Sequence, residues 1–375
     1  MLIKNGQIHD AIHEAGFAAD LRVTDGKIAE IAPNLAPKAG EEVVDAAGLW
    51  VYPGLVEAHC HTGLHGYCNG PMSMDVNEKT RPVTPEVRAI DSFNPQDEGI
   101  RFSREAGVTT ICTGPGSSDV VGGTFAAIKT AGTCVDEMIL KYPVAMKCAF
   151  GENPKKIHID HGCRVRMGVA ARLRETLFAA REYMEAKEAG EKQKYDMRME
   201  AMIPVLKGEI PLKAHVHRAD DICTAIRIAK EFGVKLTLEH CTGGAEVVPQ
   251  IKAAGVPVAV GPLLSSWNKP ELIGKSDTLA AKLDEAGIPV SIMTDGPVVL
   301  QQYLTLSAEA CIRGGMDPFH ALQAITINAA KHIGCEDRVG SLEVGKDADI
   351  VLWTGDLFCC TSTIKAVYIN GERAC

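Results

Sequence analysis

The sequence predicts an α/β fold, a (β/α)8 TIM barrel with a small β-sandwich domain formed from both chain termini. The middle of the chain alternates short apolar runs with amphipathic helical stretches, which is typical of parallel strands joined by helices. Both ends instead show short strands separated by Asn-Gly, Asp-Gly and Pro turns. The stretch 55–295 is also close to the roughly 250 residues of a typical barrel.

The terminal segments contain alternating apolar and polar residues at the spacing of β-strands. At the start of the chain these segments are MLIKNGQIHD, DLRVTDGKIAEIAP and EEVVDAAGLWVYPG. At the end they are GSLEVGKDADIVLW and TIKAVYINGERAC. Since two β-rich ends flank an α/β middle, we expect residues 1–52 and 336–375 to form one β-sandwich domain, and residues 53–335 to form the barrel.

Seven buried strands are predicted in the barrel, at 55–59, 108–113, 144–150, 211–217, 235–240, 256–260 and 288–294. A barrel of this type needs eight strands, so a weaker one is expected at 135–140 or within 70–100. The glycine-rich segment GPGSSDVVGG at 114–123 matches neither GxGxxG nor GxxxxGK[ST]. It is therefore interpreted as a flexible active-site loop and not as a nucleotide site.

Composition excludes several classes of protein. The chain has 375 residues, of which 46% are hydrophobic and 23% are charged, as in an ordinary soluble globular protein. Its net charge of −9 disfavours nucleic acid or an anionic membrane as a partner, and no apolar run approaches the roughly 18 residues of a membrane helix. The opening residues lack the layout of a signal peptide. We therefore expect a soluble, cytoplasmic protein.

Histidines and acidic residues gather at the ends of the predicted strands, where barrels of this type carry their working residues. The set comprises His59, His61, Lys147, Glu152, His215, His217, His240 and Asp295. Two His-x-His pairs each end a strand, and residues i and i+2 of a strand point to the same face. Imidazole and carboxylate together suit Zn²⁺ or similar ions, so a metal site is predicted. The alternative is a set of core histidines bonded to the backbone.

Two segments resemble a known family. The run VYPGLVEAHCHTG resembles the Pro-Gly-Leu-[Ile/Val]-[Asp/Glu]-x-His-x-His opening of the metal-dependent amidohydrolase superfamily. Near the other end, VGSLEVGKDADIVLW resembles that superfamily's return from the barrel to the small β-domain. Within it, the chain is most similar to the imidazolonepropionase-related amidohydrolases. The resemblance implies a barrel with a β-sandwich, and hydrolysis of C–N bonds in small molecules by a metal-activated water.

The resemblance also implies a set of metal ligands on the first, fifth, sixth and eighth strands, which are His59, His61, His215, His240 and Asp295. His217 competes with His215 for the fifth-strand role, and the first histidine of the pair is preferred. Two-metal members carry a bridging carboxylated lysine or glutamate, for which Lys147 and Glu152 are the candidates. Glu152 is slightly preferred because its carboxylate needs no CO₂ adduct, and Lys147 could instead form an ion pair.

The mechanism that follows is hydrolytic. Zn²⁺ is the expected metal, with one or two ions and with Fe or Mn as alternatives, and it would lower the pKa of bound water from 15.7 to about 7. Asp295 would take the proton and pass it to the leaving nitrogen, while His240 or His217 would stabilise the oxyanion. Arg218 could bind a substrate carboxylate, or instead pair with Asp220 or Asp221.

The loops that follow two of the strands are expected to meet the substrate. They are 65–81, and 263–269 with Trp267 and Asn268. The alternative for both is plain loop packing.

The function favoured by these patterns is hydrolysis of an amide or cyclic amide bond, other than a peptide bond, in a small molecule. Imidazolonepropionase, dipeptidase-type, ureide hydrolase and N-deacylase activities are alternatives. A catalytically silent barrel scaffold is the non-enzymatic alternative, and it is disfavoured because all five ligand positions are filled. A homo-oligomer is compatible with the resemblance.

Overall fold

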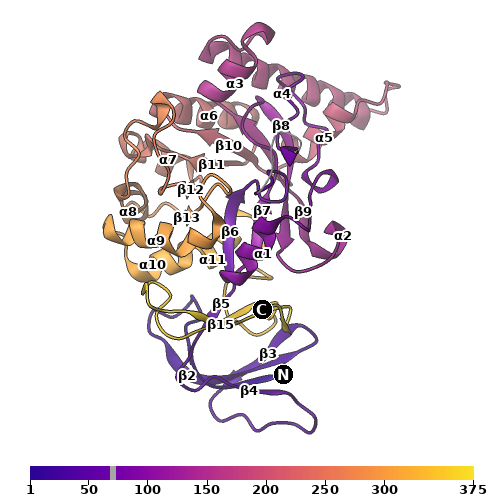
Figure 1. Cartoon of the computed structure of the whole chain (residues 1–375). Coiled ribbons are helices and arrows are strands. Elements are labelled where there is room, and N and C mark those ends of the chain that lie inside the picture. Colours follow the sequence, from indigo (N-terminus) through magenta and orange to yellow (C-terminus); the bar gives the residue numbers. More distant parts are fainter. Residues whose placement is uncertain (68–72) are drawn as a thin grey trace.

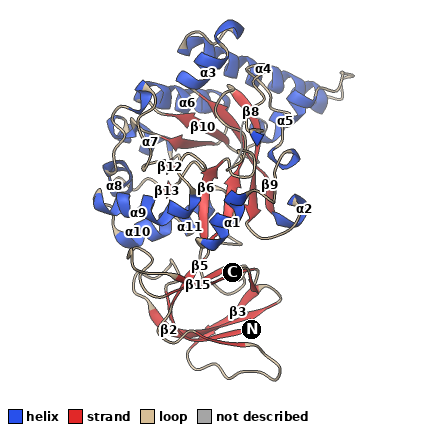
Figure 2. Ribbon diagram, in the orientation of Figure 1, coloured by secondary structure: helices blue, strands red, loops and turns tan. Residues whose placement is uncertain are grey.

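The computed structural model describes residues 1–67 and 73–375, and it has two parts (Figure 1). The larger part is a barrel of strands surrounded by helices, and the smaller is a sheet that contains both ends of the chain (Figure 2). Among the described residues, no helix combines the length and the apolar character needed to cross a membrane.

The barrel sheet has eight strands whose spatial order follows their order in the chain. They are β6 (Leu55–Cys60), β7 (Val108–Thr113), β8 (Val121–Lys129), β9 (Ile139–Ala149), β10 (Leu212–Val216), β11 (Leu236–His240), β12 (Val258–Val260) and β13 (Val290–Ile292). The first and last strands approach one another, because the backbone N–H of His61 donates to the carbonyl oxygen of Gly296 at 2.7 Å. The Thr294 hydroxyl likewise donates to the Glu57 carboxylate at 2.6 Å. The barrel is thus nearly closed.

The barrel differs from the expected (β/α)8 pattern in the direction of one strand. Strand β8 runs antiparallel to both β7 and β9, whereas the other neighbouring strands of the barrel are parallel. It begins inside the glycine-rich segment 114–123, for which the sequence predicts a flexible loop. The stretch 135–140, where the eighth strand is expected, is instead the short helix α2 (Val135–Met138) followed by the start of β9.

The sequence of β8, VGGTFAAIK, is buried throughout and so lacks the alternation that marks a half-exposed strand. Its Gly123 has φ +107°, and a Cβ there would lie 2.2 Å from the carbonyl oxygen of Val87. Glycine is required at this close approach. Gly123 therefore belongs to a tightly packed strand and not to a loop.

Helices surround the barrel strands (Figure 2). They are α1 (Glu98–Glu105), α2, α3 (Glu152–Ile157), α4 (Arg166–Glu188), α5 (Met197–Leu206), α6 (Ala219–Phe232), α7 (Val248–Ala254), α8 (Thr278–Glu285), α9 (Leu304–Arg313), α10 (Pro318–Ala324) and α11 (Ile327–His332). Helix α6 has apolar residues at helical spacing on its buried side, and it ends at Gly233, whose φ of 68° stops the helix.

The second sheet joins the two ends of the chain. Its strands are β1 (Leu2–Ile8), β2 (Phe17–Thr24), β3 (Lys27–Ala32), β4 (Val43–Asp45), β5 (Trp50–Pro53), β14 (Ile350–Trp353), β15 (Ile364–Ile369) and β16 (Glu372–Arg373). Antiparallel pairing of β5 with β14 brings the N-terminal and C-terminal strands together. Hydrogen bonding connects these strands in one continuous sheet, and we call it the terminal sheet.

A group of charged side chains around two buried aspartates links the terminal sheet to the barrel. Lys129, at the end of β8, lies 2.5 Å from the Asp349 carboxylate and 3.1 Å from that of Asp347. Asp347 also accepts hydrogen bonds from Lys27 of β3 at 2.5 Å and from Arg338 at 2.9 Å. Three cations therefore surround one carboxylate where the two parts meet.

Candidate metal and active site

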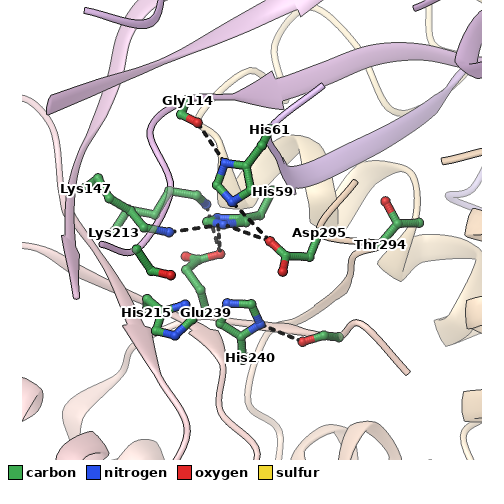
Figure 3. Close-up of polar contacts among 12 residues, drawn as sticks. His59, His61, Gly114, Lys147, Lys213, His215, Glu239, His240, Thr294 and Asp295 are labelled. Atoms are coloured by element: carbon green, nitrogen blue, oxygen red, sulfur yellow. Dashed lines mark hydrogen bonds and ion pairs between the residues drawn. The ribbon is translucent and has the colours of Figure 1, made fainter. Parts of the chain in front are cut away.

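The strand ends bring the predicted histidines and Asp295 together at one edge of the barrel (Figure 3). His59 lies on β6, His215 on β10 and His240 at the end of β11, while His61 and Asp295 follow β6 and β13. Several of these side chains line a cavity of about 480 Å³. The carboxyl ends of parallel strands meet at one edge, which is why residues so distant in the chain converge.

Two groups of side chains in this cluster are close enough to hold a metal ion. His215, His217 and His240 form one group, and His59, His240 and Asp295 form the other, with potential ligand atoms within 4.8 Å of one another in each. The Nε2 atoms of His59 and His61 lie 3.6 and 3.2 Å from Oδ1 of Asp295. His240 belongs to both groups, so it lies between them.

Backbone carbonyls orient two of the histidine rings. Nδ1 of His61 donates to the carbonyl oxygen of Gly114 at 2.7 Å, and Nδ1 of His240 donates to that of Gly261 at 2.8 Å. A ring whose Nδ1 carries the proton presents Nε2 as a lone pair, which is the form that binds a metal. Nε2 of His240 is buried and has no hydrogen-bond partner among the described residues. These donor atoms fit Zn²⁺ or a similar ion.

Positive backbone angles aim two of these side chains into the cluster. His240 has φ 71° and Asp295 has φ 54°, a left-handed conformation that is uncommon outside glycine. Consecutive residues of a strand normally point to opposite faces. Glu239 and His240 nevertheless both reach the cluster, because the strand conformation ends at His240 (Figure 3).

Burial favours the neutral form of four histidines of the cluster. It lowers the pKa of His240 to about 4, and it lowers the pKa values of His59, His215 and His217 well below the usual value. Burial by itself would raise the pKa of Asp295. The interactions with His240 and His61 have a larger effect, and they hold the pKa of this carboxyl well below its ordinary range. Neutral imidazoles beside an ionised carboxylate are ready to bind a cation.

The two candidates for the bridging position are placed differently. Lys147 is fully buried, and its Nζ lies 3.2 Å from Nε2 of His59. Burial lowers the pKa of Lys147 to about 8. Glu152 begins helix α3, and its Oε1 accepts a hydrogen bond from the backbone N–H of Glu271 at 3.1 Å. The structure thus brings Lys147 to the cluster and turns Glu152 away from it, against the preference for Glu152.

Arg218 also lies apart from the cluster. Its guanidinium forms two hydrogen bonds with the Asp220 carboxylate, at 2.9 and 2.8 Å, and its side chain is 51% exposed. The alternative interpretation, a salt bridge to Asp220, is the one that the structure shows. A local partner two residues away satisfies the guanidinium, so it does not reach the cavity.

Some residues of the two predicted substrate loops line the cavity, and others do not. His65 and Asn77 of the first loop line the cavity, while residues 68–72 lie outside the described residues. In the second loop Asn268 lines the cavity, whereas the Trp267 side chain is 60% exposed and is not part of the lining.

A buried charge network below the cluster was not predicted. The Glu239 carboxylate lies 3.2 Å from Nδ1 of His59 and 3.0 Å from Nζ of Lys213 (Figure 3). It also lies 3.0 Å from Nε2 of His332. It also accepts a hydrogen bond from the Thr237 hydroxyl at 2.6 Å. Burial raises the pKa of Glu239, but Lys213 and His332 outweigh it and hold it well below the usual value.

Lone charged residues inside the apolar strand segments LKAHV and LTLEH could have indicated this network, because buried charges need partners. Lys269 was also missed. Its Nζ lies 2.8 Å from Oε1 of Glu271 and 3.4 Å from Nε2 of His215, at the wall of the cavity.

The fold and the site together define an α/β-barrel protein with a candidate divalent-metal centre at the carboxyl ends of its strands. The family model of the amidohydrolase family matches residues 185–374, about half of the chain. The chain belongs to this family, and its predicted place in the metal-dependent amidohydrolase superfamily is confirmed.

The curated relatives that match the sequence include the following two. Amidohydrolase tasK of Hapsidospora irregularis is 27% identical over 391 residues, which cover 95% of this chain and 40% of that protein. An imidazolonepropionase of Streptococcus pyogenes is 27% identical over 236 residues, which cover 52% of this chain and 55% of that protein. The chain thus spans about half or less of the length of these relatives.

Solved structures share the fold. An amidohydrolase from Thermotoga maritima MSB8 is 39% identical, with a TM-score of 0.96 over 100% of this chain and 99% of that one. A Xaa-Pro dipeptidase is 17% identical, with a TM-score of 0.59 over 99% of this chain and 98% of that one, and this likeness concerns the fold alone.

Proposed function

We propose that the protein is a metal-dependent hydrolase of amide or cyclic amide C–N bonds, other than peptide bonds, in a small molecule. The observation that carries this proposal is the pair of buried ligand groups that share His240 and open on one cavity. Membership of the amidohydrolase family supports it.

The residues that would hold the metal are those of the two groups, with His61 beside Asp295. Zn²⁺ suits this donor set, and Fe or Mn are alternatives, with one or two ions bound. A bound divalent ion would polarise the substrate carbonyl and lower the pKa of a bound water. Lys147 is the better placed bridge if it is carboxylated, since its Nζ lies beside His59 and Glu152 lies beside Glu271.

The chain's own groups supply the proton transfers. Asp295 accepts the proton from the attacking water and delivers it to the leaving nitrogen, because its carboxylate is ionised and lies at the wall of the cavity. If His217 is not a ligand, it can stabilise the carbonyl oxygen. The Thr242 hydroxyl lies 2.8 Å from its Nδ1 and can donate there, which leaves Nε2–H as a donor toward the cavity.

Other activities of the same chemistry remain candidates. Imidazolonepropionase activity is suggested by a curated relative, and dipeptidase-type activity involves hydrolysis of the same kind of C–N bond. N-deacylase activity belongs to the same reaction class. A silent scaffold without metal is the non-enzymatic candidate.

The decisive experiment combines metal analysis with turnover. The purified protein is expected to contain one or two equivalents of a divalent metal and to hydrolyse a member of a panel of N-acyl amino acids, cyclic amides, ureides and dipeptides. Removal of the metal by a chelator should abolish turnover, and adding it back should restore it. A protein that binds no divalent metal and hydrolyses no panel member would contradict the proposal and support the scaffold.

The bridge has its own test. Lys147→Met is expected to lower the bound metal from two equivalents to one, whereas Glu152→Gln should leave the metal content unchanged because its carboxylate contacts Glu271. The opposite result would restore Glu152 as the bridge.

We further propose that residues 1–52 with 336–375 and residues 53–335 act as separate domains, with the terminal sheet arranged as a β-sandwich. A cytoplasmic location, a small-molecule substrate and a homo-oligomeric state complete the proposal. Size-exclusion chromatography with light scattering tests the oligomeric state.

A further inference from the structure

The cavity wall carries a lysine that the described residues do not neutralise. Lys275 lies between the short 3-10 helix η5 (Pro270–Leu272) and helix α8, and it lines the same cavity as His61, His240 and Asp295. Its Nζ donates to the carbonyl oxygen of Ser265 and, at 3.0 Å, to the Ser265 hydroxyl. Both partners are uncharged.

Lys275 differs in this respect from the second lysine of the wall. Lys269 lies 2.8 Å from the buried Glu271 carboxylate, which neutralises it. Within the described part of the chain, no ion pair joins Lys275 to a carboxylate. Burial lowers the pKa of Lys275, and no neighbouring acid raises it. A half-buried ammonium without a counter-ion is costly for the folded protein, so a ligand that brings a negative charge would bind favourably.

The remaining wall supports an anionic ligand. Among the described lining residues, Asp295 is the one carboxylate, and it faces the metal ligands. The other polar lining residues away from the histidine cluster include the uncharged side chains Asn77, Ser117, Asn153, Ser265 and Asn268. Away from Asp295 and the histidines, the wall thus carries Lys275 as a cation with no carboxylate to balance it. A cavity of about 480 Å³ has the size of a small-molecule site.

We propose that Lys275 binds a carboxylate of the substrate, so that the substrate is a small amide carrying a negative charge away from the bond that is broken. This inference rests on the proposed function and names the substrate class of the same site. The short charged contact would hold the substrate in the cavity while the carbonyl faces the histidines and Asp295.

The first test compares charged and neutral substrates that share the same C–N bond. N-acetyl amino acids are compared with their C-terminal amides in the metal-loaded wild-type protein, Lys275→Met, Lys275→Arg and the control Lys282→Met. Lys282 is exposed on α8 and does not line the cavity. We expect Lys275→Met to lower kcat/KM for the N-acetyl amino acids by roughly 30- to 100-fold, mainly by raising KM. The same substitution should lower kcat/KM for the C-terminal amides far less. Lys275→Arg should keep most of the preference, and Lys282→Met all of it.

The second test is equilibrium binding, which does not depend on turnover. The metal-loaded protein is titrated with glutarate and with the neutral glutaramide. Glutarate should bind at least about tenfold more tightly to the wild type, and Lys275→Met should remove most of that difference while Lys282→Met keeps it. If no amide is hydrolysed and this pattern still appears, the proposed function fails and the anion site stands.

Two outcomes would overturn the inference. One is an equal loss of glutarate binding in Lys275→Met and Lys282→Met, or no loss in either. The other is a Lys275-dependent preference for inorganic phosphate over glutarate, which would assign the site to phosphate esters instead of carboxylates.

Discussion

The ammonium group of Lys213 lies 3.0 Å from the carboxylate of Glu239 in the middle of the barrel, and neither side chain is accessible to solvent beyond 2%. Lys213 also donates to the carbonyl oxygen of Ala58 at 3.1 Å. This pair lies directly beside His59, so a charge pair that stabilises the interior also holds a candidate metal ligand in place.

Replacing Lys213 by methionine should destabilise the fold by about 3–5 kcal/mol, because the Glu239 carboxylate would stay buried without its cation. The free energy of unfolding, measured by urea denaturation, checks this. Lys235→Met, at an exposed lysine just before β11, is the matched control and should change it by less than about 0.5 kcal/mol. Equal effects of the two substitutions would show that the buried pair contributes nothing specific.

Glu239→Gln should weaken metal binding by roughly 10- to 100-fold, because Glu239 fixes the ring of His59 through Nδ1 at 3.2 Å. Competition with a chelator of known affinity measures the dissociation constant. Glu246→Gln, at an exposed glutamate after the same strand, should leave it unchanged. An unaltered metal affinity in Glu239→Gln would remove Glu239 from the support of the site.

Asp295→Asn should lower kcat by about 10²–10⁴-fold or more, since an amide can neither accept nor deliver the proton. Circular dichroism and the thermal midpoint should show that the fold is retained. Asp277→Asn, which alters an exposed pair with Arg313, serves as the control and should keep full activity. Full turnover of Asp295→Asn would refute the assigned role.

Asp347 should make stability depend on pH in the acid range. Burial alone would raise its pKa, but Arg338, Lys129 and Lys27 lower the pKa from 3.8 to about 2. A carboxyl whose pKa is lower in the folded state stabilises the protein above its unfolded pKa, and this contribution is lost as the pH falls from about 4 through about 2. The shift corresponds to about 2 kcal/mol.

Urea denaturation at pH values between 2 and 6 measures this contribution. Asp347→Asn should be less stable than the wild type at pH 6, and the difference should shrink toward pH 2. Asp160→Asn, at an exposed aspartate, should run parallel to the wild type. A difference between Asp347→Asn and the wild type that does not vary with pH would contradict the role of the ionised carboxylate.

The sequence was sufficient to predict the barrel, the meeting of the two termini in one sheet, and the convergence of His59, His215 and Asp295. Apolar runs mark buried strands, and polar residues at their carboxyl ends must meet at one edge because the strands are parallel. The sequence did not predict strand β8, because its small and apolar residues show neither the alternation of a strand nor a helical period.

The sequence predicted which side chains gather at the strand ends, but only part of their contacts. Nothing local distinguishes Lys147 from Glu152, because the choice depends on which side chain points into the barrel and which is held by Glu271, 119 residues away. The partner of Arg218 could not be predicted either, because its guanidinium could pair with the nearby Asp220 or with a substrate carboxylate.

The sequence by itself determined the fold class and the strand ends at which histidines and acidic side chains gather, since periodicity and residue type are local properties. Only the tertiary structure decided that β8 runs antiparallel, that Lys147 lies beside His59, and that Glu239 pairs with Lys213. These relationships depend on contacts between segments far apart in the chain, where burial and electrostatic pairing select one partner among several that the sequence allows.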